Sequence, residues 1–383
     1  MAGASWACAA VSAHGAGPRA KGSVLGVEAI LLVGGKGNRL RPLTVTTPKP
    51  MLPVAGVPFI AHQLAQAKSA GVDRVVLATS YKSQVFTDWL GDGARLGIQV
   101  EYVVEQTPLG TGGAMRNAAD RLLSKPDDPV VVFNGDVLSG HDLSAQLEQH
   151  RNDDTDVTLH LTEVDDPRAF GCVPIDQQGR VTAFLEKMAE PVTNRINAGC
   201  YVFRRSIIDT IPFGEIVSVE RQTFPELLAS GARVRGFVDT AYWLDVGSPQ
   251  AIVSGSRDLV LGRVPSPALP GVPGERLVLP GSRLDAAATV RGGSAVGTDV
   301  TVHRGAVVDG SVVDDGAVIE ADAVVRDSFI GAGARIGPRT VIDGAVVGDR
   351  AHIGADCEVA PGTRVWVGAV LGDLSIRTSS DQA

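Results

Sequence analysis

The chain has 383 residues, and its 35 Lys and Arg against 43 Asp and Glu leave a formal net charge of −8. With 44% hydrophobic and 20% charged residues it can bury the cores of two domains, which excludes a disordered tail protein. An acidic excess on both sides of residue 262 excludes the basic surface that nucleic acid needs, and no apolar run reaches the ~18 residues of a membrane helix. We therefore expect no nucleic acid and no membrane among the partners.

The first 26 residues are rich in Ala, Gly and Ser, which predicts a disordered extension or the product of an upstream start codon. Their Arg19 and Lys21 come late, the reverse of the basic start of a signal peptide. The cysteines are far apart and form no C-x-x-C pair, which predicts the reduced thiols Cys8, Cys172, Cys200 and Cys357. We expect a cytoplasmic protein.

From Val27 onward, short apolar runs alternate with helix-like segments, which predicts β-α units around a mostly parallel sheet. Helices are expected to begin near Pro58 and at Ala114. Strands are expected at 29–33, 75–78, 98–104 and 130–133. Shorter runs within 157–203, separated by Gly and Asp turns, predict further strands in a second layer over the sheet.

A glycine-rich loop follows the first predicted strand, with three glycines in the four positions 34–37. Glycines let a backbone approach phosphate oxygens and turn its N–H groups toward them, so we expect a phosphate cradle. The loop is not a Walker loop, because its Lys is followed by Gly, and Leu40 stands where a dinucleotide fingerprint needs its third glycine. Arg39 and Lys49 add two cations to the same loop. A flexible surface loop is the alternative interpretation of the glycines alone.

Several prolines among glycines follow the predicted sheet and break any continuing helix or central strand. They are Pro265, Pro267, Pro270, Pro273 and Pro280. The composition predicts a linker over 263–285 between a first domain at 27–262 and the remainder of the chain.

Beyond the linker, aliphatic residues recur every sixth position. They are Val290, Val296, Val302 and Val308, then Val312, Val318, Val324, Ile330, Ile336 and Ile342, and after a step of five Val347, Ile353, Val359 and Val365. A hexapeptide period with Gly or Ala beside each aliphatic is typical of a parallel β-helix. Low-complexity Val/Gly sequence is the alternative, and an unbroken run of six matches argues against it. We expect the β-helix over 286–372 and a tail at 373–383.

The string G-G-x-G-x-R-L-x-P-L-T that starts at Gly34, with Pro48-Lys49-Pro50 after it, resembles the signature of the sugar-1-phosphate nucleotidylyltransferases. The hexapeptide tail matches the subgroup with a C-terminal left-handed β-helix. Residues 47–53 and 105–113 most resemble the mannose-1-phosphate guanylyltransferases. The resemblance implies an α/β fold, a Rossmann-like mixed-sheet nucleotidyltransferase domain followed by that β-helix. It also implies a reaction in which GTP and mannose 1-phosphate give GDP-mannose and pyrophosphate.

The resemblance further implies a set of catalytic and metal-binding residues. Arg39 would bind the β- and γ-phosphates and stabilise the departing pyrophosphate, and Lys49 would lie near the α-phosphate. Asp136 and Asp245 would hold Mg²⁺. Chemistry agrees, because Mg²⁺ takes one or two carboxylates together with phosphate oxygens and water, and an Asp just past a parallel strand lies at the ligand-binding edge of a sheet. Either Asp alone would be an ordinary turn residue.

Substrate-binding residues follow from the same resemblance. Nucleotide binding is assigned to Gly34, Gly35, Gly37, Asn38, Glu105, Gly110, Thr111 and Gly112. Sugar-phosphate binding is assigned to Gly171, Glu186, Lys187 and Asn197. The Glu105 carboxylate can accept hydrogen bonds from guanine N1–H and its exocyclic amine, which favours guanine over uracil or thymine. The chain departs from the family pattern at Asn38, usually Thr, at Met188, usually Pro, and at Gly113, where Ala is common.

The implied mechanism is in-line attack of the sugar-phosphate oxygen on the α-phosphorus, which needs no general base because that oxygen is ionised at neutral pH. His62, His141, His150 and His160 are therefore given no catalytic role and are expected in helices or on the surface.

Three other functions stay open at this stage. One is a glucose-1-phosphate thymidylyl- or uridylyltransferase, and another is a non-catalytic regulatory paralogue, which would be expected to lose Arg39, Lys49 or an Asp ligand. The third is an acyltransferase in the β-helix, although His303 and His352 fall in ordinary repeats. We expect the β-helix to form a homo-oligomer instead, because a prism end exposes backbone that a partner subunit can cover.

Overall fold

The computed structural model describes residues 26–80, 82–185 and 189–379. These residues divide into two compact units. Residues 26–35 and 63–243 form the sheet unit, and residues 36–62 and 244–379 form the prism unit. The predicted extension at 1–25 and the candidate residues Glu186 and Lys187 lie outside the described residues.

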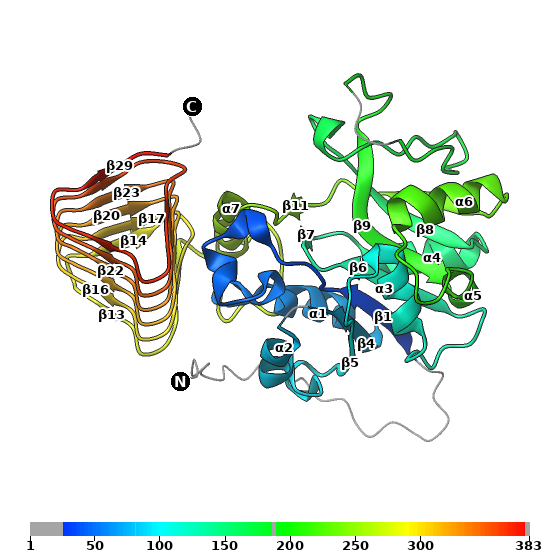
Figure 1. The fold of residues 1–383 in the computed structure, drawn as a ribbon, viewed down its shortest axis with the longest axis horizontal. Coiled ribbons are helices and arrows are strands. Elements are labelled where there is room, and N and C mark those ends of the chain that lie inside the picture. Colours follow the sequence, from blue (N-terminus) through cyan, green and yellow to red (C-terminus); the bar gives the residue numbers. More distant parts are fainter. Residues whose placement is uncertain (1–25, 81, 186–188, 380–383) are drawn as a thin grey trace. The chain divides into compact units, whose positions relative to one another are not determined.

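The sheet unit is built around one seven-stranded sheet with the strand order β10-β8-β9-β6-β1-β4-β5 (Figure 1). Its strands are β1 (Val27–Leu32), β4 (Val72–Thr79), β5 (Gln99–Val104), β6 (Pro129–Asn134), β8 (Val157–Glu163), β9 (Arg195–Arg204) and β10 (Val234–Val238). β9 runs antiparallel to both β6 and β8, and the other neighbouring pairs are parallel. The sheet is therefore mixed, which confirms the Rossmann-like fold class.

Helices pack against this sheet, α3 on β1 and β4 and α4 on β6, β8 and β9. The helices are α1 (Phe59–Ser69), α2 (Ser83–Leu90), α3 (Gly110–Ala119), α4 (Leu143–Asn152), α5 (Arg205–Asp209), the π-helix Val219–Thr223 and α6 (Phe224–Ala229). A strand covered on both faces must be apolar at every position. β6 meets this requirement over positions 129–133, where Val130, Val131 and Val132 are fully buried, and its last residue is Asn134.

Two expectations for this unit are wrong. The strands β8 and β9, expected in a second layer, extend the main sheet, and the described residues between them contribute isolated bridges such as Cys172–Leu185 and Ile175–Val181. The helix expected at Ala114 begins at Gly110, where glycines were interpreted as loop residues. Both errors arise because pairing partners and close packing, which local sequence does not reveal, decide these elements.

The β-helix fills most of the prism unit, with three six-stranded sheets of parallel strands as its faces (Figure 1). One face holds β12 (Arg276–Val278), β15 (Ser294–Val296), β18 (Val312–Val313), β21 (Phe329–Ile330), β24 (Val346–Val347) and β27 (Arg364–Val365). The second holds β13 (Arg283–Leu284), β16 (Thr301–Val302), β19 (Val318–Ile319), β22 (Arg335–Ile336), β25 (His352–Ile353) and β28 (Val370–Leu371). The third holds β14 (Thr289–Arg291), β17 (Val307–Asp309), β20 (Val324–Arg326), β23 (Val341–Asp343), β26 (Glu358–Val359) and β29 (Ile376–Arg377).

The six-residue period is confirmed, but its register is corrected over one stretch. The interior side chains there are Val313, Ile319 and Val325, each fully buried, one position after the predicted residues. The pairing of Val302 with Ile319 and of Ile319 with Ile336 gives coils of 17 residues, whereas Val290 pairs with Val308 across 18. Each 17-residue coil contains one step of five residues in place of six. The sequence predicted such a step at 342–347, and two more lie at 308–313 and 325–330.

The rest of the prism unit is a compact loop and one helix. The loop contains three 3₁₀ turns, Asn38–Leu40, Leu43–Val45 and Lys49–Met51, and the strands β2 (Pro53–Val54) and β3 (Val57–Pro58). Pro58 is the last residue of β3, and α1, the helix expected to begin near it, begins at Phe59. The helix α7 (Pro249–Val260) contacts β15. Within the described ranges, no helix combines the length and the hydropathy that a membrane span needs.

Candidate functional site

The carboxyl edge of the sheet unit carries the first part of the candidate site. Gly35 has a φ of 107°, which side chains rarely adopt, and no atom lies within 4 Å of a Cβ added there. The turn after β6 is clamped to the end of β1, because Gly135 N donates to Leu32 O at 2.9 Å. A Cβ at Gly135 would lie 2.5 Å from that oxygen, so only glycine fits. Asp136, half-buried, follows directly, so this predicted metal ligand lies at the edge that the glycine loop leaves.

Glu105 lies at the end of β5 on the same unit, and its side chain is buried. Burial raises the pKa of the Glu105 carboxyl, and a hydrogen bond from the Leu109 backbone partly offsets this. Its Oε1 atom is buried without a hydrogen-bond partner among the described residues. An orphaned buried acceptor is costly unless a ligand supplies the donor. The position is therefore suited to accept hydrogen bonds from a ligand.

The loop after Glu105 has a packing partner within the chain. Gly112 N and Gly113 N both donate to Val217 O, at 2.8 and 3.3 Å, and a Cβ at Gly110 would lie 2.5 Å from the same oxygen. Thr111 Oγ1 donates to Glu220 at 2.9 Å and accepts from Val219 N at 2.9 Å. These small residues thus let the start of α3 pack on another backbone segment, and nucleotide binding by Gly110, Thr111 and Gly112 stays a prediction.

A cavity of about 250 Å³ collects two of the residues predicted to bind sugar phosphate, Gly171 and Asn197. Asn197 is fixed by hydrogen bonds to the Tyr201 hydroxyl, 2.7 Å, and from Gly199 N, 3.0 Å. Leu185 also lines the cavity, so Glu186 and Lys187 follow a lining residue in the chain.

Sequence reasoning missed three polar residues in the same cavity, Ser218, Glu220 and Arg221. Glu220 and Arg221 belong to the π-helix Val219–Thr223, and Ser218 is its N-cap. π-Helical turns are rare, and those that occur are often at functional sites. No residue pattern in the sequence predicts one here.

The prism unit carries the two catalytic candidates Arg39 and Lys49. Gly37, with a φ of 59°, precedes the 3₁₀ turn that holds Arg39. A Cβ at Gly37 would lie 3.4 Å from Lys49 Cβ, and Thr44 Oγ1 donates to Gly37 O at 2.8 Å. The loop therefore folds back on itself, so that its two cationic residues share one compact structure.

Asp245 ends the strand β11 (Trp243–Asp245) and lies beside Arg39. A Cβ added at Gly247 would lie 3.0 and 3.1 Å from the Asp245 carboxylate oxygens and 3.2 Å from Arg39 Nη2. The guanidinium and the carboxylate therefore flank the same backbone position. Gly247 is a site residue that the sequence pattern did not single out, and a side chain there would press on both groups.

The carboxylates fit the Mg²⁺ that the resemblance implies. Hard oxygen donors suit Mg²⁺, which keeps part of its shell for phosphates and water. The part of the chain that the structure describes has no group of three or more His, Cys, Asp or Glu able to hold a metal. The assignment of Asp136 and Asp245 as protein ligands of Mg²⁺ therefore stays a prediction.

The four histidines are buried, and the expectation of a place in a helix or on the surface is confirmed for His62 and His150 but wrong for His141 and His160. His62 lies in α1 and His150 in α4, but His160 lies in β8 and stacks on His141 at a centroid distance of 4.0 Å. Burial lowers the pKa of His62 and His150 to about 4 and that of His160 to about 2. These three rings are therefore neutral near pH 7.

Two family descriptions match consecutive parts of the chain. Residues 28–260 match the family described as nucleotidyl transferase, and residues 272–359 match the GMPPB C-terminal domain. The mannose-1-phosphate guanylyltransferase of Mycobacterium tuberculosis is 54% identical over 356 residues, which cover 93% of this chain and 98% of that protein. Mannose-1-phosphate guanylyltransferase 1 of Arabidopsis thaliana is 36% identical, over 81% of this chain and 88% of its own length.

Solved structures resemble about three-fifths of the chain. HddC of Yersinia pseudotuberculosis, complexed with GMP-PN, superposes with a TM-score of 0.52 at 29% identity, over 61% of this chain and 99% of its own. A putative glucose-1-phosphate thymidylyltransferase of Bacillus anthracis, in complex with a sucrose, gives a TM-score of 0.54 at 25% identity, over 60% and 94%.

Proposed function

Because the chain belongs to the nucleotidyl transferase family, we propose that it makes GDP-mannose and pyrophosphate from GTP and mannose 1-phosphate. The observation that carries the proposal is the 54% identity to a mannose-1-phosphate guanylyltransferase over 93% of the chain. The chain has Arg39 and Lys49, the candidate catalytic side chains, and both candidate metal ligands. Their presence argues against a non-catalytic paralogue.

The chemistry proposed for the chain is positioning and charge neutralisation. An anionic oxygen of mannose 1-phosphate attacks the α-phosphorus of GTP in line, and pyrophosphate leaves from the opposite side. Arg39 binds the β- and γ-phosphates and stabilises the charge on the leaving pyrophosphate, while Lys49 serves the α-phosphate. The backbone at Gly34, Gly35, Gly37 and Asn38 supplies N–H groups to the phosphates.

Mg²⁺ is the proposed cofactor, with Asp136 and Asp245 as its protein ligands. Bound there, the ion would neutralise charge on the triphosphate. Arg39 beside Asp245 keeps a cation next to that carboxylate before any substrate binds, so it also orients the carboxylate.

Glu105 is the proposed determinant of the base. Guanine presents N1–H and an exocyclic amine on one edge, and a carboxylate can accept both hydrogen bonds, whereas uracil and thymine present one N–H there. The unpartnered Glu105 Oε1 supports this assignment. For the sugar phosphate, the cavity at Gly171 and Asn197 is proposed together with Glu186 and Lys187, the Lys on the phosphate.

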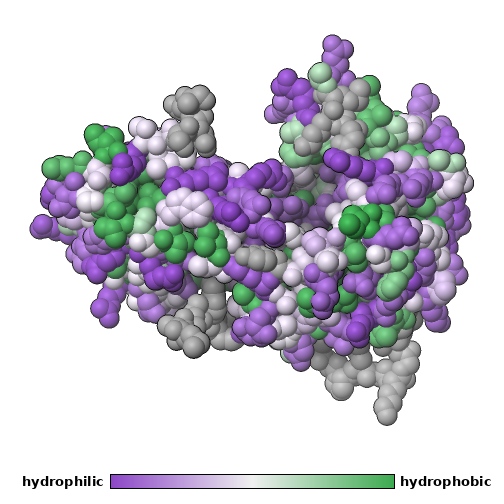
Figure 2. Space-filling view, in the orientation of Figure 1, coloured by the Kyte–Doolittle hydropathy of each residue, from purple (hydrophilic) through white to green (hydrophobic). Residues whose placement is uncertain are grey.

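Compartment and assembly are also proposals. Cys172, Cys200 and Cys357 are free and buried, which suits the reducing cytoplasm. Exposed apolar side chains gather on the last coils of the β-helix, with Trp366 52%, Val370 73%, Leu374 75% and Ile376 67% exposed. On the face drawn in Figure 2, hydrophobic residues of the β-helix stand among hydrophilic ones. A homo-oligomer through the β-helix would cover them.

The test is Mg²⁺-dependent pyrophosphate release by the full chain, with mannose 1-phosphate and glucose 1-phosphate each crossed against GTP, UTP, dTTP and ATP. We expect GTP with mannose 1-phosphate to be preferred, and Asp136→Asn to lower kcat/KM about 10³-fold. Asp88→Asn, in an exposed side chain of α2, is the matched control and should keep full activity. Preference for dTTP or UTP with glucose 1-phosphate would overturn the substrate assignment, and no release with any pair would overturn the activity.

A further inference from the structure

Within the prism unit, two hydrogen-bonded contacts hold the loop that carries Arg39 and Lys49 against the β-helix. Arg364, the first residue of β27, donates from Nη1 to Arg39 O at 2.9 Å and to Arg41 O at 3.0 Å. Thr46 Oγ1, farther along the loop, donates to Asp349 Oδ2 at 2.9 Å. Residues more than 300 positions apart in sequence therefore hold the loop that carries Arg39 and Lys49.

The Arg364 contact lies where a short helical turn ends. In the turn Asn38–Leu40, Gly37 O accepts from Leu40 N at 3.0 Å and Asn38 O accepts from Arg41 N at 3.2 Å. Carbonyls at the C-terminal end of a helical turn point out of it toward partners elsewhere, and a cation is favoured there. One guanidinium nitrogen that bridges Arg39 O and Arg41 O therefore fixes the backbone where the turn ends.

Fixing this backbone also fixes the direction of the Arg39 side chain. The Arg39 guanidinium lies beside Asp245, with Gly247 between them, and nothing bulkier than glycine would keep both groups in place. An error of 1 Å in such a group can cost up to ~100-fold in rate. The loop is short and partly exposed, so an external tie is needed to hold Arg39 at that precision.

We propose that Arg364 is a positioning residue for nucleotidyl transfer, which acts through the backbone of Arg39 and Arg41 and makes the β-helix part of the catalytic apparatus. The role of Arg39 in catalysis rests on the proposed function. The tie between Arg364 and the loop does not, so it can be tested without an assay of activity.

A guanidinium suits this task better than an ammonium. Its planar fork directs two N–H bonds of one nitrogen toward two carbonyls, whereas Lys offers a mobile point charge on a shorter reach. Arg364→Lys should therefore keep part of the effect, and Arg364→Ala should lose it. The contact is exposed, so neither change should lower the thermal midpoint much.

The first experiment measures steady-state kinetics of the full chain for Arg364→Ala, Arg364→Lys and the control Arg339→Ala. Arg339 makes a two-bond ion pair with Asp356, 2.6 Å for each bond, on the same β-helix, so its loss tests general damage to the prism. We expect kcat to fall about tenfold in Arg364→Ala and about threefold in Arg364→Lys, with the KM for sugar phosphate unchanged. Arg339→Ala should stay within about twofold of the parent.

The second experiment is hydrogen exchange of the amides of residues 38–41, which needs no substrate. These amides should exchange faster in Arg364→Ala than in the parent or in Arg339→Ala. Unchanged exchange in the loop would overturn the tie. Unchanged kcat with faster exchange would overturn the positioning role, and an equal loss in Arg339→Ala would assign the effect to the prism as a whole. A parent without activity would count against the proposed function alone.

Discussion

The carboxyl edge and the amino edge of the seven-stranded sheet, where the parallel strands end and begin, differ in the residues that form them. At the carboxyl edge, Gly135 lets the backbone after β6 approach the end of β1, and one buried oxygen of Glu105 has no hydrogen-bond partner among the residues that the structure describes. At the amino edge, charged side chains bind one another. Glu28 at the start of β1 binds Arg74 of β4 at 2.7 Å, and its other oxygen accepts from Leu123 N and Ser124 N, at 2.8 and 2.6 Å.

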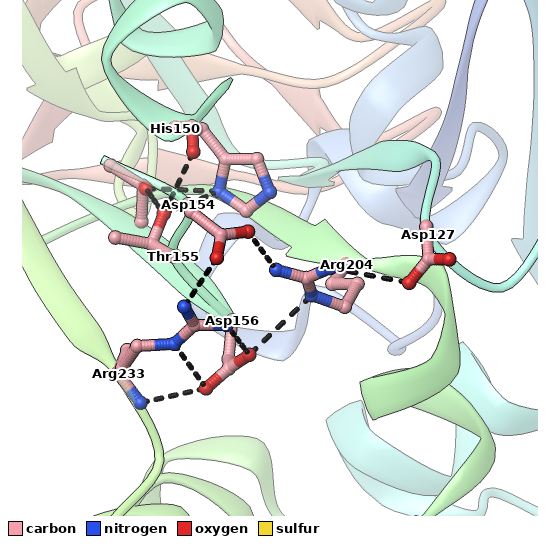
Figure 3. A network of polar contacts seen from close by, with 8 residues as sticks. Asp127, His150, Asp154, Thr155, Asp156, Arg204 and Arg233 are labelled. Atoms are coloured by element: carbon pink, nitrogen blue, oxygen red, sulfur yellow. Dashed lines mark hydrogen bonds and ion pairs between the residues drawn. The ribbon is translucent and has the colours of Figure 1, made fainter. Parts of the chain in front are cut away.

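A second ionic network, drawn in Figure 3, lies at the same amino edge, farther along the sheet. Arg204 at the end of β9 binds Asp127, Asp154 and Asp156, at 3.2, 2.6 and 3.4 Å. Arg233 binds Asp154 and Asp156 at 2.5 and 3.1 Å. Arg204 and Arg233, by their hydrogen bonds, lower the pKa of Asp154.

The difference teaches which substitutions should cost stability and which should cost function. Glu28 and Arg74 at the amino edge are buried and bind one another, so removing one leaves the charge of the other without its counter-ion, whereas Asp127, Asp154 and Arg233 of the second network are exposed. Groups at the carboxyl edge are proposed to bind a ligand, and binding sites are commonly held at the expense of stability. Substitutions at the two edges should therefore separate the free energy of unfolding from the kinetic constants.

The largest effect is expected for Arg74→Met. Glu28 and Arg74 are buried, 3% and 8% exposed, so the lone Glu28 charge should lower the free energy of unfolding by about 3–5 kcal/mol. Urea unfolding measures this loss, and kcat/KM of the folded fraction should stay at the parental value. A loss below about 1 kcal/mol would mean that the amino edge does not depend on this pair.

The next effect concerns pH and His150, which lies beside the second network. Burial, with Arg204 and Arg151, lowers the pKa of His150 to about 4. Its neutral form is favoured in the folded state, so its stabilisation is present above pH 6.5 and is lost as the pH falls from about 6.5 to 4. The full loss below pH 4 is about 3 kcal/mol, and about 2 kcal/mol of it falls between pH 7.5 and pH 5, where urea unfolding measures it.

His150→Gln removes that titrating group, so the difference in stability between the two pH values should shrink. His352→Gln, in an exposed side chain of β25, is the matched control and should retain the parental difference. An undiminished pH dependence in His150→Gln would assign the acid sensitivity to other groups.

The smallest effect is expected at the carboxyl edge, from Glu105→Gln. The amide is neutral, and it can no longer accept both hydrogen bonds of guanine, so the kcat/KM ratio of GTP to UTP should fall about tenfold. Removing a buried carboxylate whose pKa is raised by burial should leave the free energy of unfolding equal or higher. An unchanged nucleotide ratio would remove Glu105 from base selection, and a large loss of stability would contradict the contrast between the edges.

Much of the fold follows from local patterns. The hexapeptide period predicts the β-helix because each interior residue repeats the same environment, and the glycine loop predicts a backbone that approaches a ligand closely. The register over Val313, Ile319 and Val325 was missed by one residue because a corner can lose a residue without disturbing the period elsewhere. The place of β8 and β9 in the main sheet was missed because strand order depends on pairing between distant segments.

The site divides in the same way. Arg39, Lys49, Asp136 and Asp245 stand in contiguous motifs and can be found in the sequence. Gly247 becomes a site residue only when Arg39 folds against it, and Arg364 only when a coil of the prism meets the loop. Nothing in a hexapeptide repeat distinguishes Arg364 from Arg335, which binds Glu320 at 3.1 Å instead.

The coils of the β-helix also set the position of Arg364 along the axis of the prism. Each coil raises the chain by one strand spacing, about 4.8 Å, so Arg364, in the sixth strand of its face, stands about 24 Å above β12. A coil gained or lost before β27 would move this guanidinium by a full spacing and present another side chain to the loop. The positioning role proposed for Arg364 therefore ties the function of the loop to the number of coils before β27, although the coils resemble one another in sequence.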